Sequence, residues 1–246
     1  MKTRIRFVSM CMVLCLLCGM AGGIGMPRSA EGKSSGFRTS YKNMSVGGAR
    51  FIVKGDRKII MQKNGRSVTV ARKPHLPYST NGRVLYYTQY NSYEDTKIIK
   101  VDLKTLKTTV IERGQSLAMK GVNGNYMYMG NDMEADGVDL YALNLKTHRK
   151  QFMRGVVGSV VFKKNTVLTT TNTGDVGNYP IVIFSKDGRN KKKIADGVTG
   201  SIRGGHIYYI RYGSGKFKVF RTDLRGNNKT AVSGWLSEFP TKYSAW

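Results

Sequence analysis

Short apolar runs alternate with polar turns along most of the chain. The runs are four to six residues long, rich in β-branched and aromatic side chains, and bounded by Gly, Asn, Asp and Lys, as in residues 84–87, 126–129 and 207–210. Such runs are typical of β-strands. No window repeats apolar residues with a sustained period of 3.6, so we expect almost no helix. The pattern therefore predicts an all-β protein.

The strand pattern repeats with a period near 40 residues. Five similar turns end at Gly65, Thr105, Thr147, Gly188 and Gly226, with spacings of 40, 42, 41 and 38 residues. Each turn lies between two strands, and two further strands complete each unit. Repeats of four short strands are typical of a β-propeller, in which every sheet buries its faces against its neighbours. We therefore predict a β-propeller of five four-stranded blades over residues 41–246.

Closure of the ring is predicted to involve the C-terminal end of the chain. Residues before Arg50 provide a weak innermost strand for the first blade, whereas residues 235–239 stand where the next innermost strand would follow the fifth unit. We expect this segment to pair into the first blade and close the ring. A β-sandwich or open barrel with irregular strands is the alternative, and the fivefold turn spacing argues against it.

Residues 1–25 have the layout of a secretory signal peptide. Lys2, Arg4 and Arg6 precede an apolar run over 7–17, and small residues follow. The run is shorter than the roughly 20 residues that a permanent transmembrane helix needs, and no other run approaches that length. We expect a mature chain without a transmembrane segment, with a retained N-terminal anchor as the alternative. Residues 26–40, rich in Gly, Ser and charge, are interpreted as a flexible leader.

All three cysteines, Cys11, Cys15 and Cys18, lie in the predicted signal peptide. Its removal would leave no thiol for a disulfide, a zinc site or nucleophilic catalysis. The residues around Cys18 also resemble a bacterial lipoprotein box, in which this cysteine is acylated and becomes the N-terminus. We expect a secreted or surface-associated monomer, with lipid anchoring through Cys18 as an alternative.

The repeat resembles the propeller repeat of the low-density-lipoprotein-receptor-related type and is also similar to the repeats of TolB. An aromatic strand at 207–209 is followed by a polar loop and by a strand and turn over 218–229. Residues 83–88 approach the Tyr-Trp-Thr-Asp signature, with Tyr87 in place of Trp and Gln89 in place of Asp. The resemblance implies a propeller fold and a binding role, and it provides no catalytic residues to transfer.

Charge bears on the choice of partner. The chain has 41 Lys and Arg against 15 Asp and Glu, a formal charge of +26, which attracts anions. One predicted propeller face collects basic hairpins that we expect to bind anionic wall or membrane polymers, through Arg189, Lys191, Lys192, Lys193, Lys163 and Lys164. A solvated basic rim is the alternative. Stacking aromatics are not interleaved with these charges, which argues against nucleic acid.

The opposite predicted face receives loops rich in Tyr and Asn. Tyrosines stack on sugar rings or peptide side chains, and amides orient hydroxyl groups. The predicted ligand-binding residues are Tyr90, Tyr93, Asn131, Asn172, Tyr179 and Tyr212. The alternative is that these tyrosines only cover the ends of the blades.

Metal binding has one weak candidate. Asp132, Glu134 and Asp136 alternate ahead of Gly137, as in the first half of a calcium loop. The twelfth position of that loop would be Leu143, which lies in a predicted strand. We therefore interpret this segment chiefly as a polar hairpin, with calcium as the alternative, and expect no other cofactor.

Catalytic chemistry has little support in the sequence. The histidines His75, His148 and His206 share no motif, and Glu238 is an isolated carboxylate in the predicted innermost strands. Asp102, Asp187 and Asp223 recur beside turns, where carboxylates cap backbone donors. We predict a non-catalytic binding or scaffold module for a carbohydrate, a peptide or another protein, or an anionic cell-envelope polymer. The alternative is a glycan-acting enzyme of the five-bladed type, which would use paired carboxylates.

Overall fold

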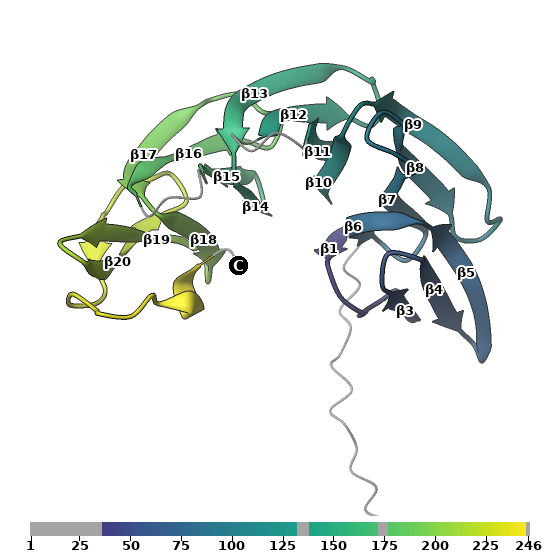
Figure 1. Ribbon diagram of the computed structural model, residues 1–246, viewed down its shortest axis with the longest axis horizontal. Helices are drawn as coiled ribbons and strands as arrows, with labels where there is room; N and C mark the ends of the chain where they lie inside the picture. Colours follow the sequence, from purple (N-terminus) through teal and green to yellow (C-terminus); the bar gives the residue numbers. More distant parts are fainter. Residues whose placement is uncertain (1–35, 132–137, 172–176, 245–246) are drawn as a thin grey trace, which may run out of the picture. The chain divides into compact units, whose positions relative to one another are not determined.

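The computed structural model describes residues 36–131, 138–171 and 177–244 (Figure 1). Their secondary structure is β-strand except for a short 3-10 turn at Thr241–Tyr243. The strands form five antiparallel sheets in chain order. The predicted signal peptide and most of the predicted leader lie outside the described residues.

Blades 1 and 2 are formed by the first half of the described chain. Blade 1 contains β2 (Met44–Val46), β3 (Ala49–Lys54), β4 (Lys58–Lys63) and β5 (Arg66–Arg72). Blade 2 contains β6 (Pro74–Thr80), β7 (Val84–Tyr90), β8 (Thr96–Asp102) and β9 (Thr108–Gly114), with β1 (Arg38–Ser40) added along β6.

Blades 3 to 5 repeat the same order of four antiparallel strands. Blade 3 contains β10 (Leu117–Asn123), β11 (Tyr126–Asn131), β12 (Val138–Asn144) and β13 (Lys150–Val157). Blade 4 contains β14 (Ser159–Lys163), β15 (Thr166–Thr170), β16 (Tyr179–Ser185) and β17 (Lys192–Gly197). Blade 5 contains β18 (Thr199–Arg203), β19 (His206–Gly213), β20 (Lys216–Asp223) and β21 (Thr230–Ala231).

The five repeated turns all lie between the third and fourth strands of their blades, as the sequence predicts. The chain is therefore an all-β propeller with five blades, and its period comes from one blade per repeat. Asp or Asn at the end of the third strand stabilises some of these turns: Asn144 Oδ1 accepts the backbone N–H of Lys146 and Thr147 at 2.9 and 3.1 Å.

The core consists of four hydrophobic clusters, each between two consecutive blades. Neighbouring residues of one strand belong to different clusters: Leu85 packs against blade 1, and Tyr86 packs against blade 3. In the same way, Val167 packs against blade 3 and Leu168 packs against blade 5. Successive side chains of a strand point to opposite faces, so a sheet buried on both sides needs a continuous apolar run. This is why the second strands read as unbroken apolar segments.

The innermost strands of blades 2, 3 and 4 meet through a small set of side chains. Thr39 in β1 pairs with Ser79, and their hydroxyl oxygens lie 2.7 Å apart. A Cβ atom at Gly121, where φ is +149°, would lie 2.5 Å from the Phe162 ring and 2.8 Å from Thr39 Oγ1. Glycine therefore permits this close approach. Residues 38–40, at the end of the predicted leader, are thus an ordered part of the propeller.

The C-terminal segment differs from the predicted closing strand. The innermost strand of blade 1 is β2, which pairs with β3, whereas Leu236 pairs with Phe217 in β20 of blade 5. Rings of the same segment pack on blade 5, with Phe239 5.3 Å from Phe217 and Tyr243 5.3 Å from Tyr208. These contacts cover the apolar face of blade 5 that points away from blade 4. They correct the expectation that residues 235–239 complete the first blade.

Candidate binding sites

A pocket of about 240 Å³ opens where blades 2 and 3 meet, on the face that carries the loops between second and third strands. The end of β7 and the starts of β6, β8 and β10 surround it. Its lining residues are His75, Thr88, Tyr90, Thr96, Ser116, Leu117 and Ala118. The 91–95 loop beside it is held by a hydrogen bond from Asn91 Nδ2 to Asp95 Oδ2, 2.8 Å long.

Two buried threonines fix the wall of this pocket. Thr96 Oγ1 accepts the N–H of Leu117 at 2.7 Å and donates to the carbonyl oxygen of Gly114 at 2.5 Å. Thr88 Oγ1 accepts the N–H of Met119 at 2.9 Å. Because these hydroxyls belong to blade 2 and two of the backbone groups to β10 of blade 3, they set the position of one blade against the other. Their hydrogen bonds are already made within the protein.

Ser116 differs from these threonines. Its side chain is buried, with 4% exposed, and its Oγ is one of two buried side-chain polar atoms that lack a hydrogen-bond partner in the described residues. The other is Thr199 Oγ1. The Ser116 backbone is held at φ +52° by an N–H bond to the Tyr93 carbonyl at 2.8 Å. An unpaired buried hydroxyl costs roughly 1–3 kcal/mol, which a bound hydrogen-bonding group would recover.

An aromatic wall completes the pocket. Tyr90 is 39% exposed, and its ring centroid lies 6.3 Å from that of His75. In the sequence, His75 shares no motif with the other histidines, and Ser116 belongs to none of the candidate sites. Nothing in the sequence marks Ser116, because its distinguishing feature is burial without a partner.

The predicted tyrosine and asparagine set divides between two places. Tyr90 lines the pocket, the Tyr93 carbonyl holds Ser116, and Asn131 pairs with Leu117 at the pocket edge. Tyr179 and Tyr212 belong instead to blades 4 and 5, where Asn178 hydrogen-bonds the Tyr212 backbone at 2.7 and 2.9 Å. Asn172 and the calcium candidates Asp132, Glu134 and Asp136 lie outside the described residues.

Three members of the predicted basic cluster contact polar or acidic groups of the same region. Lys192 Nζ donates to the Arg225 carbonyl at 2.8 Å, and Lys193 Nζ lies 2.8 Å from Asp196 Oδ1. Arg189 Nε lies 4.0 Å from Asp187. The remaining members, Lys163, Lys164 and Lys191, are exposed. Lys164 lines a hollow of about 440 Å³ that also includes Asn190 and Arg225, so hairpins of blades 4 and 5 come together here.

Turn carboxylates have the structural role that the sequence predicts. Asp102 Oδ1 accepts the N–H groups of Thr105 and Lys104 at 2.8 and 2.9 Å, and these bonds lower its pKa. Asp223 Oδ1 accepts N–H groups of Asn227 and Arg225, both at 2.8 Å, and its pKa is lowered in the same way. Within the described ranges, no cluster of three or more His, Asp or Glu side chains could hold a metal ion.

Comparisons with known proteins support the fold. The chain matches no family model and no curated protein. It is similar in structure to a putative TolB from Agrobacterium tumefaciens, with 10% identity and a TM-score of 0.54 over 82% of this chain and 83% of that one. An oligogalacturonate lyase from Vibrio parahaemolyticus has 14% identity and a TM-score of 0.52 over 78% of this chain and 64% of the lyase.

A puromycin-hydrolysing peptidase from Mycobacterium tuberculosis has 13% identity and a TM-score of 0.54 over 83% of this chain. This chain spans less than two thirds of the lyase and 39% of the peptidase. The likenesses confirm a TolB-like propeller fold. No helix among the residues that the structure describes is long and apolar enough to cross a bilayer.

Proposed function

We propose that this chain is a secreted or surface-associated, non-catalytic binding propeller. Its pocket between blades 2 and 3 holds one ring-sized, hydroxylated group, such as a sugar residue of a cell-envelope polysaccharide. The observation that carries this proposal is the buried Ser116 hydroxyl, which lines the pocket and has no partner in the described residues. The extracytoplasmic location rests on the signal-like sequence of residues 1–25.

The size and chemistry of the pocket favour a sugar ring. A volume of about 240 Å³ is below the usual range of roughly 300–1,000 Å³ for sites that take drug-sized ligands. The Tyr90 ring offers an apolar surface for stacking, and Leu117 and Ala118 continue it. Ser116 provides the hydrogen bond that fixes orientation. No Lys, Arg, Asp or Glu is among the described lining residues, so a neutral group fits better than an ion.

Binding accounts for this pocket better than catalysis does. Glycosidases generally use two carboxyl groups that flank the scissile bond. Among the described lining residues, the titratable side chains are His75 and Tyr90. The similarity to a lyase and a peptidase supports the shared fold alone.

The test is saturation-transfer NMR and calorimetry on the full chain with neutral monosaccharides, including glucose, galactose, rhamnose and N-acetylglucosamine. We expect Ser116→Ala to weaken binding about three- to tenfold, as the loss of one hydrogen bond does. Tyr90→Ala removes the stacking surface and should weaken binding further. Thr199→Val is the matched control, because it removes the other unpaired buried hydroxyl, in blade 5, and should leave affinity unchanged.

Two results would contradict the proposal. The first is sugar binding that survives both Ser116→Ala and Tyr90→Ala. The second is the absence of binding to every neutral sugar, together with binding of a peptide that protects the Tyr90 resonances.

A further inference from the structure

Cations stand directly opposite one another on one face of blade 1. In the strand register, Lys54 pairs with Lys58, and Lys58 pairs with Arg72, so three positive side chains form one row across β3, β4 and β5. All three are exposed. Like charges directly opposite in neighbouring strands are destabilising. Repulsion among these three side chains therefore lowers the stability of blade 1.

This row belongs to what we call the free face of blade 1, the side of the sheet that points away from blade 2. Its remaining residues alternate with the blade 1 core residues along the strands; they are Arg50, Ile52, Ile60, Gln62, Ser67 and Thr69. Arg50 lies four residues from Lys54 along β3, about 13 Å at the usual rise of a strand. Half-buried Ile52 and Ile60 lie between the two positively charged ends.

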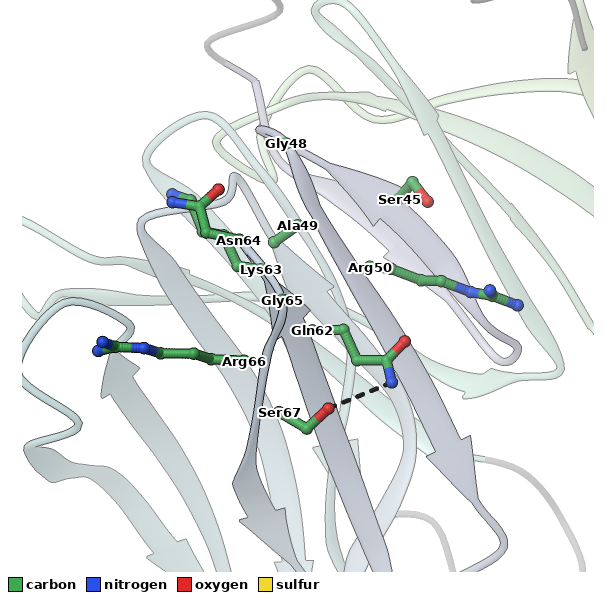
Figure 2. Close-up of a pocket in the computed structure, with 10 residues that line it drawn as sticks. All are labelled: Ser45, Gly48, Ala49, Arg50, Gln62, Lys63, Asn64, Gly65, Arg66 and Ser67. Carbon is green, nitrogen blue, oxygen red and sulfur yellow. Dashed lines mark hydrogen bonds between the residues drawn. The ribbon is translucent and has the colours of Figure 1, made fainter. Parts of the chain in front are cut away.

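A hollow of about 520 Å³ opens at the Arg50 end. Figure 2 shows Gln62 hydrogen-bonded to Ser67 at 3.2 Å, with the Arg50 side chain extending beside them. Lys63 and Arg66, which pair across the hairpin, also line the hollow, and Figure 2 shows the Arg66 side chain extending to the side opposite Arg50. No Asp or Glu is among its described lining residues, so the hollow is cationic.

Local counterions are scarce around this face. Residues 36–72 contain nine Lys and Arg and a single acid, Asp56. Within the described residues, no ion pair involves a side chain of the free face. The predicted basic cluster of blade 4 differs, because Lys193 and Arg189 have acidic partners there, Asp196 and Asp187. The blade 1 row therefore combines like-charge repulsion with the lack of an ion pair within the described residues.

The ends of the described chain leave this face open. Residues 235–243 pack on blade 5, and β1 pairs with β6 of blade 2. Neither segment adds a strand to blade 1, whose four strands come from residues 44–72.

We propose that the free face of blade 1 binds a linear polyanion, a polymer that carries phosphate, sulfate or carboxylate groups at intervals. Charge complementarity carries the argument, because one anionic chain lying along β3 meets Arg50 at one end and the Lys54–Lys58–Arg72 row at the other. The half-buried isoleucines between them accommodate the uncharged part of the repeat. This site is separate from the neutral pocket of the proposed function and does not depend on it.

The experiment uses the full chain and three labelled probes: dextran sulfate, inorganic polyphosphate and uncharged dextran. The test variant is Lys54→Gln/Lys58→Gln/Arg72→Gln. The matched control, Lys163→Gln/Lys164→Gln/Lys191→Gln, removes the same charge from blade 4. At low salt we expect the blade 1 variant to bind both polyanions at least about tenfold more weakly, with a shallower dependence on salt concentration. The control should change affinity less than about threefold, and dextran should not bind.

Stability provides an independent readout, because the blade 1 variant should melt at the same temperature as wild type or higher once the like charges are removed. Equal losses in both variants would show attraction by net charge alone and overturn the proposal. Unchanged affinity in the blade 1 variant would also overturn it. Ser116→Ala should keep full polyanion binding, which distinguishes a failure here from a failure of the proposed function.

Discussion

Leu236 and Phe217 form two backbone hydrogen bonds with each other, at 2.7 and 2.8 Å. The outermost strand of blade 5, β21, lies between them in the sequence. This pair anchors the C-terminal segment on the last sheet. Trp235 packs beside it over Gly213, where an added Cβ would lie 3.1 Å from the indole ring. The segment therefore acts as a cap for the terminal blade, as end segments do in repeat proteins.

Ending the chain before Trp235 should destabilise blade 5 first. The truncation exposes Phe217 and Tyr208, and burial of an aromatic side chain contributes roughly 1.5–3 kcal/mol when complete. We expect a loss of about 2–3 kcal/mol in the free energy of urea unfolding. Hydrogen exchange should accelerate in β19 and β20 and remain slow in β7. Equal acceleration in all five blades would instead show that the segment supports the entire propeller.

Replacing Gly121 with Ala should disturb the contact between the inner strands of blades 2, 3 and 4. The added Cβ meets the Phe162 ring at 2.5 Å, and φ is +149°, so both crowding and backbone strain oppose it. We expect a loss of about 2 kcal/mol or more in chemical denaturation. Phe162→Leu combined with Gly121→Ala should lose less than the sum of the two single changes. Strict additivity would show that backbone strain alone accounts for the effect.

The turn carboxylates predict how stability depends on pH. Hydrogen bonds lower the folded-state pKa values of Asp102 and Asp223, with the backbone N–H of Thr105 and of Asn227 as the largest contributions. A lowered pKa adds stability above the unfolded value, near 4 for aspartate, and that contribution is lost as the pH falls through the folded pKa. Unfolding free energy should therefore be steady from about pH 7 to 5 and decrease below about pH 4.

The matched variant is Asp102→Asn/Asp223→Asn, because Asn144 already caps the equivalent turn of blade 3 without a charge. It should fold normally and show a weaker decline between pH 5 and pH 3 in urea titrations. An identical decline in wild type and variant would assign the acid sensitivity to other groups.

The sequence predicts the propeller well because its signals are local and repeated. Strand composition and the Asp or Asn caps are local to each blade, and the turns repeat at a regular spacing. Five similar segments therefore predict five blades. The placement of the chain ends depends on which of two blades, far apart in the sequence, binds the C-terminal segment. Residues 44–46 supply the inner strand of blade 1, and the open apolar face at Phe217 and Tyr208 takes the segment expected elsewhere.

The candidate pocket was predictable only in part. Tyr90 and Asn131 end second strands and Tyr93 lies in the loop after one of them, and the strand pattern is sufficient to place all three on one face of the propeller. Ser116 is an ordinary polar residue between two strands, and its importance comes from burial and from the lack of a partner. Similarly, the repulsion between Lys54, Lys58 and Arg72 depends on the strand register, including the bulge after Ile59.

Ser116 provides a test that separates a binding residue from a structural one. Its unpaired hydroxyl destabilises the protein without ligand, so Ser116→Ala should raise the free energy of unfolding by about 1 kcal/mol. Alanine keeps the backbone strain at φ +52°, because it still has a Cβ atom, and Ser116→Gly, which relieves this strain, should be at least as stable as Ser116→Ala. Both variants should nevertheless bind sugar more weakly than wild type.

Urea unfolding with and without saturating monosaccharide measures both effects in one experiment. Bound ligand should stabilise wild type more than either variant, because only wild type gains the Ser116 hydrogen bond. When a residue serves binding at the expense of stability, its removal raises the free energy of unfolding and weakens ligand binding. If Ser116→Ala lowers stability without ligand, the hydroxyl already has a partner in solution, and the argument for a ligand at this position fails.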